Sequence, residues 1–157
     1  MSETAVLAEK LKTEGEKLAG FFESLTGDQW TTEVYAEGST WTVRSILAHL
    51  MTAERAFLKL FDDIRQGGPG TSQDFVIDRY NARQQEKTRD SAPAELLEQF
   101  GDVRKRMVSW VAGLDDAELE RTGRHPFLGV TTLREMIKLV YIHNQTHLRD
   151  IRKALRV

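Results

Sequence analysis

The sequence lacks cysteine entirely among its 157 residues. Disulfide bonds and thiolate metal ligands are therefore excluded, and any bound metal must be held by nitrogen or oxygen atoms. A chain without disulfides fits a reducing compartment, so a cytoplasmic location is the default expectation.

Neither an excess of one charge nor a long apolar run is present. The chain carries 22 Lys and Arg against 24 Asp and Glu, for a net charge of −2. Because nucleic-acid binding requires a concentrated basic face, we expect no nucleic-acid partner. A membrane span requires roughly 20 mostly apolar residues, and no stretch of that kind occurs, so we also expect no membrane partner. The length favours a single soluble domain over residues 1–157.

Four long segments have apolar residues at helical spacing, and no segment has the alternation that indicates a strand. The four predicted helices run from about Glu3 to Leu25, Thr42 to Gln66, Pro93 to Gly113 and Thr132 to Leu155. Thr42 and Thr132 are typical N-caps, and proline is common in the first turn of a helix. These segments predict an all-α fold, a four-helix bundle.

The connections between these segments differ in length. The longest, residues 67–92, begins with a glycine-rich turn and contains a stretch, residues 74–90, that predicts a short extra helix. Residues 29–41 and the stretch GRHPFLGV, residues 123–130, are expected to be loops. Asp115 and Glu118 are placed to cap a single helical turn.

Two of the four histidines, His143 and His147, lie four residues apart in the last predicted helix. They are about 40° apart around the helix and share the apolar arc of Val140 and Met136. His49 lies at the edge of the apolar arc of the second helix. A buried imidazole without partners costs about 1–3 kcal/mol, and a shared metal ion would satisfy one nitrogen of each ring. Hydrogen bonds to backbone carbonyls or carboxylates in a polar core layer are the alternative.

Four further residues are candidates for the same region. His125 precedes Pro126 in an expected loop, so we expect it to be exposed; a fourth ligand or a substrate contact is the alternative. Asp150 follows His147 by one helical turn and either orients a ligand or, as we expect, pairs with a surface Arg or Lys. Tyr80 either lines a pocket mouth or lies at the bundle end, and Asn81 has no assigned role.

The stretches WTVRSILAHLMTAERAFLKL and VYIHNQTHLRDIRKAL resemble the DinB-like family, which includes thiol-dependent S-transferases and mycothiol-dependent maleylpyruvate isomerases. The resemblance covers nearly the whole chain in helix order and length. It implies a four-helix bundle with a three-histidine metal site. Ala48-His49-Leu50 matches the context of the first ligand, and His143 and His147 match the other two. Members of the family commonly pair, so the resemblance also implies a homodimer.

Three neutral imidazoles leave at least one coordination position open, as in catalytic sites. Imidazole ligands favour Zn²⁺ or Ni²⁺, with Fe²⁺, Co²⁺ and Mn²⁺ as alternatives. Such a site can activate water for hydrolysis or bind a low-molecular-weight thiol as co-substrate.

The histidines lack the neighbouring glutamate of an H-E-x-x-H helix, and thiol transfer requires less of a base than hydrolysis. We therefore expect a thiol-dependent S-transferase acting on a small electrophile, with a metal-hydroxide hydrolase as the variant. No catalytic side chain beyond the ligands is assigned. The alternative is a non-enzymatic metal-binding helical protein, either a stress-associated scaffold or a small-ligand-binding module.

Overall fold

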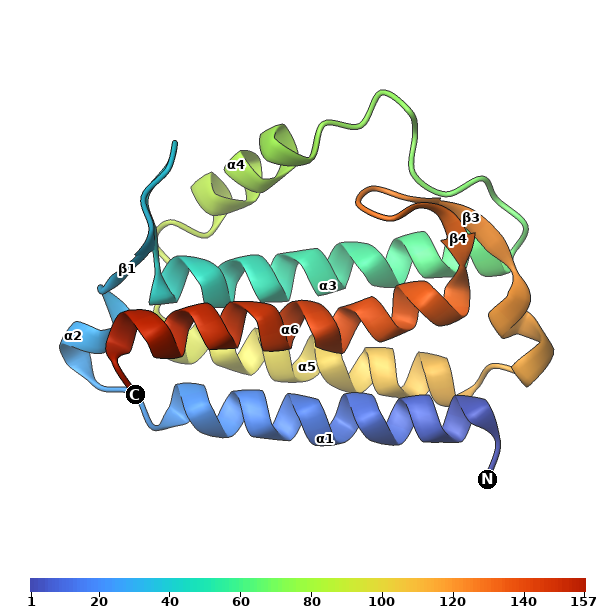
Figure 1. Ribbon diagram of the computed structural model, residues 1–157, viewed down its shortest axis with the longest axis horizontal. Helices are drawn as coiled ribbons and strands as arrows, with labels where there is room; N and C mark the ends of the chain where they lie inside the picture. The colour runs from blue at the N-terminus through green and yellow to red at the C-terminus, as the bar shows by residue number, and fades with distance from the viewer.

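Four long helices lie side by side along the longest dimension of the molecule (Figure 1). The computed structural model describes the whole chain, residues 1–157. The helices are α1 (Glu3–Glu23), α3 (Val43–Arg65), α5 (Pro93–Ala112) and α6 (Leu133–Leu155). Both α1 and α3 pack against α5 and α6. The structure confirms the predicted four-helix bundle.

The helix boundaries follow the predicted signals closely. The hydroxyls of Thr42 and Thr132 accept hydrogen bonds from the backbone N–H groups three residues later, and Pro93 is the first residue of α5. The long connection carries the predicted extra helix, α4 (Ile77–Lys87), which lies over α3 (Figure 1). Asp115 and Glu118 form a capping box on the 3₁₀ helix η1 (Asp116–Glu120).

The expectation that the two stretches 29–41 and 123–130 are loops is wrong. After the short helix α2 (Gly27–Trp30), strand β1 (Glu33–Tyr35) pairs antiparallel with β2 (Trp41–Thr42). Strand β3 (Thr122–His125) pairs antiparallel with β4 (Gly129–Thr132). These strands have at most four residues, too few to show the alternation by which a strand is recognised. Packing against the ends of the bundle stabilises them instead.

The core consists of two apolar clusters, one at each end of the bundle. One contains Leu11, Phe61 and Met136, and the other contains Phe22 and Phe100. None of the helices combines the length and apolar character needed to cross a membrane.

A buried polar layer centred on Arg104 lies between the two clusters. Its guanidinium donates two hydrogen bonds to the Glu54 carboxylate, at 2.8 and 2.7 Å, and one to the carbonyl oxygen of Leu11 at 2.9 Å. It also donates to the side-chain oxygen of Asn144. Gly15 leaves space for the Arg104 side chain, because a Cβ at position 15 would lie 2.8 Å from Cγ of Arg104. One side chain of α5 thus contacts α1, α3 and α6.

Replacing Arg104 with alanine should lower the free energy of unfolding by about 3–5 kcal/mol. The reason is that Glu54, only 2% exposed, would keep its buried carboxylate without a partner. Urea unfolding followed by circular dichroism measures the change. The control is Arg89→Ala, which removes an exposed ion pair with Glu86 and should cost less than about 1 kcal/mol. Equal losses in the two variants would contradict the importance of the polar layer.

Candidate functional site

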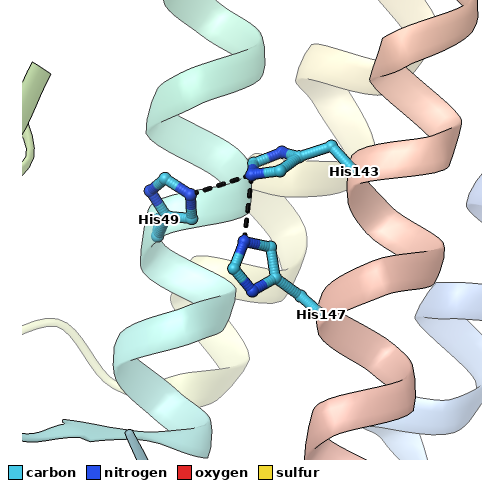
Figure 2. A group of neighbouring side chains, drawn as sticks. All are labelled: His49, His143 and His147. Atoms are coloured by element: carbon cyan, nitrogen blue, oxygen red, sulfur yellow. Dashed lines mark hydrogen bonds between the residues drawn. The ribbon is translucent and has the colours of Figure 1, made fainter. Parts of the chain in front are cut away.

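The imidazoles of His49, His143 and His147 point toward one another between α3 and α6 (Figure 2). The Nε2 atom of His143 lies 3.1 Å from Nε2 of His49 and 3.0 Å from Nε2 of His147. The candidate ligand atoms of the three residues all lie within 4.8 Å of one another. The histidines singled out in the sequence therefore form one cluster, which we call the three-histidine cluster.

The spacing of these nitrogens suits a shared metal ion. Ligand nitrogens about 2.0–2.1 Å from a tetrahedral ion stand roughly 3.3 Å from each other. The two short Nε2–Nε2 distances, 3.1 and 3.0 Å, are close to that value. Hydrogen bonding alone serves this arrangement poorly, because one nitrogen of His143 faces two others and neutral rings have few protons to share. The cluster can therefore hold a metal.

Burial keeps the cluster in the neutral form that binds metals. Burial first, and then charge on the neighbouring rings, lowers the pKa of His49 to about 2 and that of His143 to about 3. Burial also lowers the pKa of His147, while the Asp150 carboxylate acts in the opposite direction. At neutral pH all three rings thus offer an unprotonated nitrogen.

Tyr35, which was not singled out from the sequence, connects His147 to Asp150. The Tyr35 hydroxyl donates to Oδ2 of Asp150 and lies 2.9 Å from Nδ1 of His147. Burial, followed by these contacts with Asp150, raises the pKa of Tyr35, so the phenol stays protonated. Its oxygen then accepts from Nδ1–H of His147, which leaves the Nε2 lone pair directed at the cluster.

These contacts, which we call the Tyr35–Asp150 relay, favour the orienting alternative for Asp150 over the surface ion pair. The carboxylate does approach the neighbouring Arg149, but only to 4.0 Å, so the expected surface ion pair is the weaker contact. The bond to Tyr35 gives Asp150 the orienting position instead. No local signal in the sequence could have found Tyr35, because it lies in β1, 112 residues from its histidine partner.

The β1–β2 hairpin also supplies Trp41, whose ring packs against that of His49 with the centroids 4.9 Å apart. One of the two stretches expected to be a loop therefore carries two aromatic residues onto the cluster. The contacts of Tyr35 and Trp41 restrict the rotation of two of the three imidazoles.

A cavity of about 620 Å³ lies next to the cluster and includes all three histidines in its wall. Residues of α3 and α6 form one part of its lining, and the rest comes from the long connection, α4, the β3–β4 hairpin and Trp41 of β2. The lining includes Phe57, Leu60, Phe75, Ile77 and Leu139, and contains no Asp, Glu, Lys or Arg. Tyr80 and Asn81 belong to the wall, which supports the pocket-mouth alternative for Tyr80. The cavity suits an uncharged, mostly apolar molecule.

A second cavity of about 420 Å³ is more polar. Glu37, Ser39 and Asp78 contribute to its lining. It shares Trp41 and Asn81 with the larger cavity, so the two spaces adjoin there.

His125 is buried, not exposed as expected, with only 2% of its surface accessible. It ends strand β3, and its Nδ1 accepts hydrogen bonds from the backbone N–H groups of Phe127 and Leu128, at 3.0 and 3.1 Å. The ring packs on Phe57 with the centroids 5.1 Å apart. Its Nε2 is buried and has no hydrogen-bond partner. An unpaired buried N–H costs about 1–3 kcal/mol, which marks this atom as unusual.

The glycine-rich turn after α3 contacts the β3–β4 hairpin, which carries His125, and so fixes its position. Arg124 donates its backbone N–H to the carbonyl of Pro69 at 3.0 Å, and its own carbonyl accepts from Thr71 at 2.8 Å. Gly70 has a φ of 87°, and a Cβ there would lie 2.5 Å from the carbonyl oxygen of Arg124. Only glycine permits this close approach. The stretch is a turn, as predicted, and it also pairs with β3.

A three-histidine cluster on two helices of a four-helix bundle is the arrangement that the family resemblance implied. A comparison with models of protein families tests the family itself. Residues 10–151 match the sequence model of the DinB superfamily. The chain belongs to the DinB superfamily. A search of curated proteins found no match.

Solved structures share the fold along nearly the whole chain. YfiT from Bacillus subtilis, described as a probable metal-dependent hydrolase with an unusual four-helix bundle topology, has a TM-score of 0.79 and 21% identity. The match covers 99% of this chain and 89% of YfiT. An uncharacterised protein from Escherichia coli UTI89 has a TM-score of 0.77 and 15% identity, covering 98% and 92% of the two chains. The colibactin self-resistance protein ClbS, solved in complex with dsDNA, has a TM-score of 0.73 and 17% identity, covering 98% and 97%.

The burial of His125 predicts a pH dependence of stability. Burial lowers its pKa to about 4 from an ordinary value of 6.5, so below 6.5 the unfolded chain binds a proton that the folded chain does not. This contribution is fully present at neutral pH and is lost as the pH falls toward 4, by about 3 kcal/mol in total. Urea unfolding of metal-free wild type and His125→Gln across this range should show a steeper decline for the wild type. Parallel curves would mean that folded His125 titrates like an exposed histidine.

Proposed function

We propose that this protein is a metal-dependent enzyme whose divalent ion, Zn²⁺ or Ni²⁺ by preference, is held by Nε2 of His49, His143 and His147. The supporting observation is the convergence of three neutral imidazole nitrogens on the wall of a cavity large enough for a small molecule. Three protein ligands are the number found in catalytic zinc sites, whereas structural sites are closed by four.

Each group around the ion has a defined task. When bound, the ion supplies a Lewis acid that makes a thiol or a water molecule more acidic and leaves a coordination position for it. The Tyr35–Asp150 relay orients the ring of His147, and Trp41 packs against His49. The apolar lining excludes water and so strengthens electrostatic interactions within the cavity.

The reaction that fits this lining best is the transfer of a small electrophile to a low-molecular-weight thiol. Hydrolysis benefits from a general base, and no carboxylate or lysine lines the cavity. A thiol requires less help, because its proton is released to solvent as its sulfur bonds to the electrophilic carbon and the leaving group departs. The adjoining polar cavity, with Glu37, Ser39 and Asp78, offers space for the hydrophilic body of such a thiol.

A hydrolase is the second candidate, and the likeness to YfiT favours it. Water would then take the place of the thiol at the same site. Because YfiT is only 21% identical, the likeness supports this reaction less directly than the lining supports thiol transfer.

The proposed substrate is a small molecule. ClbS was solved with dsDNA, but this chain has a net charge of −2 and so lacks the basic excess typical of DNA-binding surfaces. The absence of a nucleic-acid partner, the homodimer, the single domain and the cytoplasmic location stay predictions.

Removing one ligand should remove the metal without unfolding the protein. Untagged wild-type protein should bind one divalent ion per chain, and His49→Ala should weaken that binding by more than about 100-fold, since even loss of an outer partner costs about 10–100-fold. Elemental analysis and competition with a chromogenic chelator give the affinity, and circular dichroism checks the fold. His125→Gln is the matched histidine control and should keep its metal, because His125 is not part of the cluster.

The same proteins separate the candidate activities. Chlorodinitrobenzene with a panel of low-molecular-weight thiols reports thioether formation and chloride release, and nitrophenyl acetate without thiol reports hydrolysis. Thiol-dependent turnover that is lost in His49→Ala supports the transferase. Ester hydrolysis alone would favour the hydrolase, and bound metal with neither activity would favour the non-enzymatic binding protein. Wild-type protein without affinity for divalent ions would refute the proposal.

The Tyr35–Asp150 relay should contribute to metal affinity. Tyr35→Phe removes the oxygen beside Nδ1 of His147 and keeps the aromatic ring, so metal binding should weaken by about 10–100-fold with little change in fold. The control is Tyr141→Phe. Tyr141 is also partly buried but lies on α6 and is not in contact with the relay, so loss of its hydroxyl should leave the metal affinity unchanged. Equal affinities for wild type and Tyr35→Phe would show that the relay does not orient the ligand.

A further inference from the structure

The Nε2 atom of His125 is a buried polar atom without a partner, and His125 is one of the residues that line the 620 Å³ cavity. The histidine side chain is 2% exposed, so bulk water does not satisfy it. The hairpin backbone occupies its other nitrogen, and Phe57 covers the ring. The unpaired edge of the ring is therefore held in a fixed position by the protein.

The hydrogen bonds of His125 define which nitrogen carries the proton. Nδ1 accepts from the N–H groups of Phe127 and Leu128 and thus uses its lone pair. In a neutral imidazole the other nitrogen then carries the hydrogen. His125 therefore presents an N–H donor, and it requires an acceptor atom.

The rest of the lining defines the class of molecule that brings this acceptor. No Asp, Glu, Lys or Arg lines the cavity, so in the metal-free protein an ionic ligand would leave its charge unpaired. Among the other polar groups of the wall, the Thr146 hydroxyl already donates to the carbonyl of Ile142 at 3.0 Å. Apolar and aromatic side chains supply most of the remaining surface, including Phe57, Phe75 and Leu139.

We propose that His125 is a substrate-binding residue that donates its Nε2–H to a carbonyl-type oxygen of an uncharged, mostly apolar substrate. That the bound molecule is a substrate rests on the proposed function, whereas its binding to His125 does not require the metal. Phe57, on which His125 packs, lies eight residues after His49 on α3, a separation of about 12 Å along a helix. A two-ring aromatic molecule carrying a carbonyl group spans most of that distance, with its other end near the three-histidine cluster.

The test uses two probes of nearly equal shape, acetonaphthone and isopropenylnaphthalene, in which a C=O group is exchanged for C=CH₂. Equilibrium dialysis against the full-length protein, as purified and again with chelator, measures their affinities. In His125→Phe the affinity for the ketone relative to the alkene should fall by about 3- to 10-fold, the value of one hydrogen bond, while alkene binding changes less than about twofold. With chelator present, naphthalenesulfonate, which is charged, should bind at least about 10-fold more weakly than the ketone.

Two further variants make the result specific to His125. His125→Gln can accept from the hairpin backbone and still present an N–H, so it should restore much of the preference for the ketone, even if His125→Phe distorts the hairpin. Tyr80→Phe removes the hydroxyl of another residue of the same wall and should leave the preference unchanged.

Several outcomes would overturn the proposal. They are an unchanged ketone preference in His125→Phe, a loss confined to Tyr80→Phe, and, with chelator present, sulfonate binding as tight as that of the ketone. Because dialysis is also performed with chelator, a protein that fails to bind metal can still pass or fail this test. Failure of the metal-dependent function and failure of the His125 contact are thus distinguishable.

Discussion

The contact of Arg104 with all the other long helices is the constraint on which the site depends. Its guanidinium joins Glu54 of α3 to Asn144 of α6 and also reaches the backbone of α1. Glu54 lies five residues after His49, and Asn144 directly follows His143. A shift of α3 against α6 by one turn, about 5.4 Å, would break these bonds and separate the histidines. The buried polar layer therefore holds the two halves of the three-histidine cluster in register.

The two hairpins complete the site on that frame. One brings Tyr35 and Trp41 against the imidazoles, and the other closes the cavity with His125. Both are short and lie at the bundle ends, so they add function to a bundle whose stability comes from the apolar clusters and the Arg104 layer. The result is a cavity without Asp, Glu, Lys or Arg in its lining, with the imidazoles of the three-histidine cluster and His125 in its wall.

The sequence predicted the parts that depend on helical periodicity. The four long helices, the short helix α4 and the convergence of His49, His143 and His147 follow from apolar spacing, capping residues and the family resemblance. The two hairpins, the contacts of Tyr35 and the burial of His125 could not be predicted from these features. They depend on contacts between segments far apart in the chain, such as Arg124 with Pro69, and on strands too short to have a pattern. Long-range pairing of this kind leaves no local signal.

The most direct test of the account is X-ray absorption spectroscopy of the full-length protein loaded with Zn²⁺. The account predicts a coordination shell with three imidazole nitrogens at about 2.0–2.1 Å, plus at least one light atom from solvent. In His143→Ala, which removes the central nitrogen of the cluster, this signature should disappear. A shell of oxygen atoms alone, or an unchanged spectrum in that variant, would contradict the claim that these histidines hold the metal.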